Sequence, residues 1–235
     1  MVYMSNYIRK KVPHMFTHIE IPELPKIIQK TQPNGKRTYI IPNGNEYPSV
    51  TTVLGDKEKP WLDDWRKMLG DKKAANETKR CADRGTAIHL LAEKYLNNEE
   101  IITKGLKPEY ISDFNKLKLG LNSIDNIRAQ EVGLYSDRMQ VAGTVDCVAE
   151  YKKVLSIIDF KTSTNNKTKD MISDYFKQCT AYAIAWHERT GEAIEDIVII
   201  IAVERAMMPL IFTDKIENWI PALLKDIAAY TAKNK

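Results

Sequence analysis

One stretch of sequence decides the fold of this chain: Gly143-Thr-Val-Asp-Cys-Val-Ala-Glu-Tyr-Lys-Lys-Val-Leu-Ser-Ile-Ile-Asp-Phe-Lys-Thr-Ser163. Two apolar, β-branched runs on either side of a polar pair predict an antiparallel hairpin. If Lys152 and Lys153 form its turn, Asp146 lies directly opposite Asp159. Because side chains alternate along a strand, Lys161 then emerges on the same face as Asp159.

Two opposed carboxylates destabilise a sheet unless something compensates their charge. The flanking residues are apolar enough for interior strands, so a divalent cation is the natural partner, and carboxylate oxygens suit Mg²⁺ or Mn²⁺. A cation held by Asp146 and Asp159 beside the Lys161 ammonium is suited to phosphodiester hydrolysis. The alternative is a hairpin-edge Asp146 and a surface ion pair between Asp159 and Lys161.

The rest of the chain predicts an α/β or α+β fold, with a central mixed sheet that contains a three-stranded antiparallel meander and is flanked by helices. The predicted strands cover residues 130–135, 140–151, 154–161 and 197–203. The predicted helices cover residues 49–54, 61–69, 80–96, 108–127, 171–190 and 216–233. The apolar run at 197–203 is typical of a central strand.

The first 48 residues differ from the remainder in charge. They hold seven basic and three acidic side chains, which accounts for the whole net charge of +4. Prolines and turn signals exclude a long helix there, and residues 36–50 predict a β-hairpin turning at Asn43-Gly44. We therefore divide the chain into a basic arm, 1–48, and a body, 49–235, with a helical part at 49–128 and a sheet-and-helix part at 129–235.

Composition limits the class of protein. No apolar run approaches the roughly 20 residues of a membrane helix, and the first residues show no secretory signal, although an organelle presequence stays open. The three cysteines lack CxxC spacing, which excludes a disulfide framework and favours a reducing compartment. We expect a soluble, non-secreted protein with no membrane partner.

Three motifs together resemble the RecB-type exonuclease branch of the PD-(D/E)xK nuclease superfamily, which includes mitochondrial and phage exonucleases. Asp146 followed by Asp159-Phe-Lys161 resembles its central motif, Gly85-Thr-Ala-Ile-His89 resembles its GxxxH element, and Gln178-xxx-Tyr182 resembles its QxxxY element. The resemblance covers roughly residues 48–203. Val145 stands where the motif has Pro, and the second acid is Asp rather than Glu.

The resemblance implies a restriction-endonuclease-like core and a metal-dependent DNA exonuclease acting on single-stranded ends in replication, recombination or repair. It implies one or two Mg²⁺ or Mn²⁺ ions held by Asp146, Asp159, His89 and the Phe160 carbonyl. Lys161 would position the water. Only three cysteines are present, so we expect no iron–sulfur cluster.

Three further residues complete the expected site. Gln178 and Tyr182, one helical turn apart, would order the site and the nucleic-acid backbone. Glu131 matches an acid of the family, and a turn at Asp137-Arg138 would place it across from Thr144. A catalytic Glu131 and a solvated strand-start Glu131 both remain open.

A mixture of aromatic and basic groups is expected to handle the nucleic acid by stacking and phosphate contact. The expected set is Trp61, Trp65, Arg80, Arg84, Thr162, Ser163, Lys36 and Arg37. The helix pair before the GxxxH element occupies the place of an arch that threads a single strand in related enzymes. The alternatives are a core tryptophan pair, a plain strand-exit turn at 162–163 and an inert arm.

Two other functions remain open at this stage. One is a restriction-like or structure-specific endonuclease on the same core, and the other is a non-catalytic DNA-binding module. The compactness of a nuclease domain without a helicase favours a phage setting, in the cytoplasm of a bacterial or phage-infected cell, over a mitochondrial one.

Overall fold

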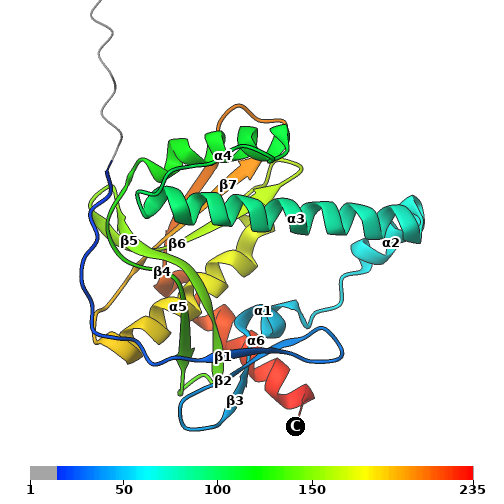
Figure 1. Cartoon of the computed structure of the whole chain (residues 1–235). Helices are drawn as coiled ribbons and strands as arrows, with labels where there is room; N and C mark the ends of the chain where they lie inside the picture. The colour runs from blue at the N-terminus through cyan, green and yellow to red at the C-terminus, as the bar shows by residue number, and fades with distance from the viewer. Residues whose placement is uncertain (1–14, 235) are drawn as a thin grey trace, which may run out of the picture.

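A five-stranded mixed sheet with the order β4-β5-β6-β7-β8 lies at the centre of the computed structural model, which describes residues 15–234 (Figure 1). Its strands are β4 (Ile124–Ser136), β5 (Val141–Tyr151), β6 (Val154–Ser163), β7 (Asp196–Val203) and β8 (Leu210–Lys215). Only β6 and β7 run parallel. The predicted fold class is confirmed. Arg9, Lys10 and Lys11 of the basic arm lie outside the described residues.

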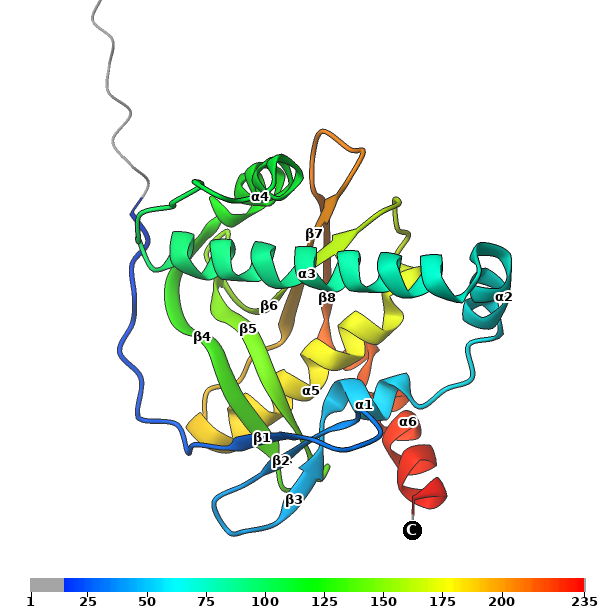
Figure 2. The ribbon, with the colours of Figure 1, turned by 45° about the vertical axis from the view of Figure 1, so that its right-hand side comes forward.

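Helices cover both faces of this sheet. They are α1 (Val50–Gly55), α2 (Pro60–Leu69), α3 (Asp71–Leu96), α4 (Pro108–Leu121), α5 (Ser173–Thr190) and α6 (Ile220–Lys233), with short 3₁₀ turns at Asp170–Ile172 and Ile216–Asn218. Helices α3 and α4 pack on one face, and α1, α5 and α6 pack on the other (Figure 2). None of these helices, within residues 15–234, is long and apolar enough to cross a membrane.

Alternation along the central strands builds two separate cores. Ile158 and Ile200 pack beneath α3 and α4, whereas their neighbours Ile157 and Ile199 pack beneath α5. Because both faces of β7 are covered, its apolar side chains are all buried. This explains the uninterrupted apolar run in the sequence.

The hairpin of β5 and β6 forms as predicted. Lys152 and Lys153 both adopt left-handed backbone conformations, with φ of 50° and 70°, and they form the two-residue turn. The ladder runs from Tyr151–Val154 to Cys147–Ile158. Continuing this register by one residue sets Asp146 opposite Asp159.

The register between β4 and β5 differs from the prediction. The turn is centred one residue later than predicted, between Arg138 and Met139, because Ser136 pairs with Val141. Buried Met139 lies inside this turn, and its N–H donates to Ser136 Oγ at 3.1 Å. Thr144 consequently pairs with Gly133 rather than with Glu131.

Several other element boundaries differ from the predicted ones. Helix α4 ends at Leu121, so the predicted helix at 108–127 was too long, and Ile124 instead begins β4 opposite Tyr151. Helix α3 begins at Asp71, nine residues before the predicted start at Arg80, and it absorbs the charged stretch. Strand β8 was not predicted, because its short alternating pattern of half-buried and exposed residues belongs to a sheet edge.

A second, three-stranded antiparallel sheet is formed by β1 (Ile28–Thr31), β2 (Arg37–Ile40) and β3 (Glu46–Pro48). The predicted hairpin is β2 and β3. Tyr39 and Tyr47 of this sheet pack against Tyr135 and Ala142 of the meander. The N-terminal sheet therefore lies against β4 and β5, and the division at residue 48 stays a prediction.

Candidate active site

The predicted catalytic residues, except the buried Asp159, line a cavity of about 450 Å³, here called the site cavity. Elements far apart in the sequence supply its walls: α3, β4, β5, β6 and α5, together with β2 and α1 of the N-terminal region. It is lined by Arg37, Tyr39, Ser49, Thr51, His89, Glu131, Gly143, Thr144, Asp146, Lys161, Tyr175, Gln178 and Tyr182.

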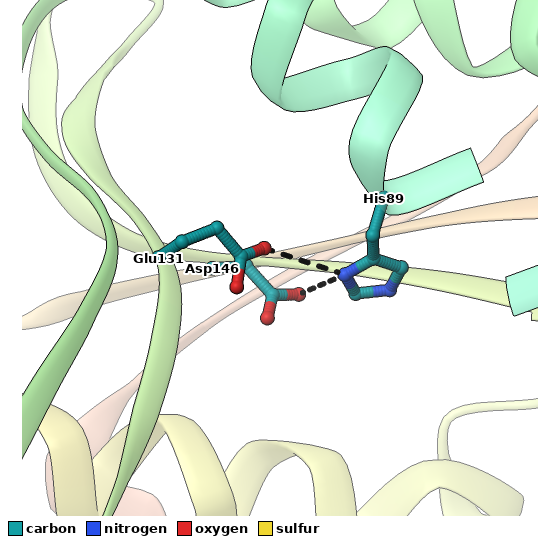
Figure 3. Close-up of side chains that lie close together, drawn as sticks. All are labelled: His89, Glu131 and Asp146. Atoms are coloured by element: carbon teal, nitrogen blue, oxygen red, sulfur yellow. Dashed lines mark ion pairs between the residues drawn. The ribbon is translucent and has the colours of Figure 1, made fainter. Parts of the chain in front are cut away.

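His89, Glu131 and Asp146 form a compact group in the cavity (Figure 3). His89 Nδ1 lies 3.7 Å from Glu131 Oε1 and 3.6 Å from Asp146 Oδ2. One ligand atom from each residue falls within 4.8 Å of the others. Burial lowers the pKa of His89, but the Glu131 and Asp146 carboxylates outweigh burial, and the net shift is upward.

Glu131 reaches this group because of the observed register between β4 and β5 and because of its own uncommon backbone conformation. The pairs Gln130–Cys147 and Val132–Val145 bracket Glu131 and Asp146 on neighbouring strands. Glu131 has a φ of 48°, a left-handed conformation that is uncommon for residues other than glycine and costs about 1–3 kcal/mol. The surrounding ladder must hold it, and its carboxylate faces the imidazole of His89.

Asp159 and Lys161 complete the charged part of the site. Lys161 Nζ lies 2.5 Å from Asp159 Oδ1. Burial raises the pKa of Asp159 to about 6, against the opposing charge of Lys161. Burial lowers the pKa of Lys161, but Asp159 and Asp146 outweigh it and shift that pKa upward, so the ammonium stays protonated at neutral pH.

Gln178 connects the carboxylates to α5. Its Nε2 donates to Asp159 Oδ1 at 3.3 Å and to the Tyr182 hydroxyl at 3.4 Å. The two residues of the predicted pair thus share one face of α5 and touch the site. Tyr175 lies on the same face, and Lys161 Nζ stands 5.1 Å from its ring centroid. Sequence reasoning missed Tyr175, although its position three residues before Gln178 could have indicated it.

The hydrogen bonding and the charge of these residues fit a divalent cation. Asp159 Oδ2 is buried and has no hydrogen-bond partner among residues 15–234. The orientation of the Asp146 carboxylate is fixed, because the Phe160 N–H donates to its Oδ2 at 2.8 Å. Three carboxylates facing one ammonium and one imidazole leave negative charge that a hard cation would offset. A ligand role for the Phe160 carbonyl stays a prediction.

The glycine of the Gly143-Thr-Val-Asp sequence is required by packing. A methyl group at Gly143 would lie 2.6 Å from the Tyr182 hydroxyl oxygen. Gly143→Ala is therefore expected to displace the Tyr182 ring and to lower the free energy of unfolding by about 1–3 kcal/mol. Chemical denaturation measures this loss.

Gly85→Ala is the matched control for Gly143→Ala. A methyl group at Gly85 would lie 3.8 Å from Thr162 Oγ1, an ordinary contact, and alanine favours a helix interior. We expect Gly85→Ala to retain or gain stability. Equal stability of Gly143→Ala and the wild type would contradict the packing role.

Five of the expected nucleic-acid residues, Arg84 among them, line a second cavity of about 470 Å³, here called the tryptophan pocket. It contains Trp61 and Trp65 of α2 and Thr162 and Ser163 at the end of β6. Trp61 is 66% exposed, and neither tryptophan belongs to a core cluster of the described residues. Tyr175 lines both this pocket and the site cavity.

Arg80 and Arg84 are placed differently from the other expected nucleic-acid residues. The Arg84 side chain is 1% exposed and pairs with Asp113 at 2.7 Å and with Glu204. Arg80 pairs with Glu77 at 2.6 Å and with Glu204 at 2.7 Å. Carboxylates neutralise both guanidinium groups; that of Arg80 lies at the surface, whereas that of Arg84 is closed off from solvent. Their arrangement is one of a structural ion network.

The structure also separates Lys36 from Arg37. Lys36 Nζ lies 2.9 Å from Asp56 Oδ1, and the pairing with Asp56 raises the pKa of Lys36. Arg37 instead lines the site cavity. Thr51 and Tyr39, which also line it, had no signal in the sequence, because only the packing of the N-terminal sheet brings them there.

Comparisons with known proteins point in the same direction. Over 131 residues the chain is 29% identical to mitochondrial genome maintenance exonuclease 1 of Mus musculus, which is 52% of this chain and 39% of that protein. It is 30% identical over 143 residues to the Xenopus tropicalis protein of that name, and 29% identical over 166 residues to the Homo sapiens one. These similarities support a nuclease family.

The matched regions cover only part of this chain and part of each relative. The matches cover 52%, 55% and 64% of this chain, but only 39%, 39% and 47% of the relatives. The chain thus spans less than half the length of the curated relatives it matches. No family model matches the chain.

Proposed function

We propose that this chain is a metal-dependent DNA exonuclease of the RecB-type branch of the PD-(D/E)xK superfamily, acting on single-stranded ends. The observation that carries the proposal is the convergence of one imidazole, two carboxylates and one lysine at the site cavity, with the buried Asp159 carboxylate paired to that lysine. Four elements that are separate in sequence supply them, and the exonuclease relatives support the same activity.

Glu131, Asp146 and His89 would hold the metal, together with the unpartnered oxygen of Asp159. When bound, Mg²⁺ or Mn²⁺ polarises the scissile phosphoryl group and lowers the pKa of a water molecule. The Phe160 N–H fixes the orientation of Asp146. Because Asp159 is buried with a raised pKa, a nearby cation would favour its ionised form.

Lys161 would act on the reacting groups directly. Its ammonium is held by Asp159 at 2.5 Å and stays charged, so it can orient the attacking water and neutralise charge on the transferring phosphoryl group. Gln178 holds Asp159 from α5, and Tyr182 holds Gln178 in turn. These two residues would keep the carboxylate aligned.

The tryptophan pocket would receive bases next to the scissile bond. Thr162 and Ser163 of this pocket directly follow Lys161 of the site cavity, and Tyr175 lines both cavities. Exposed aromatic rings stack on unpaired bases without sequence preference. An unpaired strand can present its bases in this way, whereas the bases of a duplex are already stacked.

The test is release of nucleotides from a labelled single strand of DNA. Release is expected with Mg²⁺ or Mn²⁺ and is expected to stop on addition of EDTA. Absence of release with either metal would overturn the proposal. We place the protein in a reducing, phage-type setting, whereas the relatives are named for the mitochondrial genome.

A further inference from the structure

The N-terminal sheet places a positively charged side chain at the site cavity. Arg37, at the start of β2, lines the cavity together with Thr51 of α1, and both meet the same space as His89 and Asp146. A segment that precedes the three sequence motifs therefore contributes directly to the site.

The backbone of Arg37 is anchored on both sides by the start of α1. Its N–H donates to Thr52 Oγ1 at 3.1 Å, and its carbonyl accepts the Ser49 N–H at 2.9 Å. The Arg37 guanidinium also donates through Nη2 to Thr51 Oγ1 at 2.8 Å. The backbone contacts fix the position of the residue, and the Thr51 contact directs its exposed side chain.

The charge of Arg37 is not neutralised. No carboxylate within residues 15–234 forms an ion pair with it. The nearby cations are committed: Lys36 pairs with Asp56 at 2.9 Å, and Lys30 pairs with Glu46 at 3.6 Å. One of the five guanidinium N–H groups of Arg37 serves Thr51, and the planar fork of arginine matches the oxygens of a phosphate.

We propose that Arg37, positioned by Thr51, binds a phosphate of the nucleic-acid strand at the site cavity. The proposal deepens the nuclease function and rests on it. Carboxylates at a catalytic site repel a polyanion, so a fixed, unpaired cation on the same cavity gives the strand a defined point of attachment.

Binding without cleavage tests this role. Anisotropy of a labelled single strand of about 15 nucleotides is measured in EDTA, from about 50 to 200 mM salt. Arg37→Ala is expected to weaken binding about 10- to 100-fold. It should also flatten the dependence of binding on salt by roughly one phosphate contact. Arg37→Lys, which keeps the charge but loses the fork, should fall between Arg37→Ala and the wild type.

The matched control is Lys30→Ala, which removes one positive charge from the same sheet at an exposed pair. It is expected to leave affinity and salt dependence unchanged. Thr51→Val keeps every charge, so it should raise KM for cleavage with Mg²⁺ while leaving the salt dependence as in the wild type. Circular dichroism checks that each variant is folded.

Two results would overturn the assignment: wild-type affinity for Arg37→Ala, or equal weakening by Arg37→Ala and Lys30→Ala. The second would mean a diffuse basic surface. If the wild type binds the strand through Arg37 but releases no nucleotide with Mg²⁺ or Mn²⁺, the phosphate site stands and the nuclease function fails.

Discussion

Lys161→Ala is expected to reduce kcat for metal-dependent nucleotide release by about a hundred- to a thousand-fold. The ammonium lies 2.5 Å from Asp159 Oδ1 and is the charged donor of the hairpin that faces the site cavity. Removing it would take away the group that we propose orients the water and offsets charge on the phosphoryl oxygens. Release of label from a single strand, followed at saturating substrate, gives kcat.

The control for Lys161→Ala is Lys153→Asn. Lys153 lies at the exposed turn of the same hairpin with a φ of 70°, a conformation that asparagine tolerates. This change also removes one positive charge, and kcat is expected to stay at the wild-type value. Wild-type kcat in a folded Lys161→Ala variant would contradict the assigned role.

Asp159→Asn distinguishes the role of the Asp159 carboxylate from the role of Lys161. The substitution keeps the shape of the side chain but removes the charge that faces Lys161 and the unpartnered Oδ2. Activity should fall as it does in Lys161→Ala, and Mg²⁺ binding measured by calorimetry should weaken as well. Lys161→Ala is expected to retain metal binding, since lysine is not a ligand.

Arg84→Ala is expected to lower the free energy of unfolding by about 3 kcal/mol, the low end for breaking a buried ion pair, because Asp113 keeps Lys116 and Glu204 keeps Arg80. Arg84 and Asp113 are 1% and 3% exposed and lie 2.7 Å apart. Arg84 also pairs with Glu204 and donates to the Ser163 carbonyl at 3.0 Å, which ties α3 to the ends of β6 and β7. Urea denaturation measures the loss.

Lys79→Ala serves as the comparison on the same helix. Lys79 and Asp83 form an exposed pair, with side chains 76% and 49% exposed, so the loss of stability should be much smaller. If Arg84 instead contacted nucleic acid, Arg84→Ala would weaken strand binding and leave stability nearly intact. That result would contradict the structural role.

The parts of the fold that local patterns determine were predictable. A two-residue polar turn sets the register of β5 and β6, and this register alone places Asp146 opposite Asp159. The apolar run of β7 identified an interior strand for the same reason. In both cases the hydrophobic pattern and the turn agree.

The parts that depend on distant packing were not predictable. Glu131 lies beside Asp146 rather than Thr144 because the turn is centred one residue later than predicted, and no local rule indicates that Met139 is buried inside it. Arg84 was expected to bind nucleic acid, yet Asp113 and Glu204, far along the chain, enclose it. Lys36 and Arg37 are adjacent in sequence, but only the structure shows that one is paired with Asp56 and the other lines the site cavity.

One digestion tests the central claim most directly. Linear single-stranded DNA labelled at its 5′ or 3′ end, and circular single-stranded DNA of the same sequence, are incubated with the protein in Mg²⁺ and in EDTA. We predict that the linear strands are degraded to nucleotides only with Mg²⁺, and that the circle stays whole. Cutting of the circle would indicate an endonuclease, and intact linear strands in both Mg²⁺ and Mn²⁺ would contradict the account.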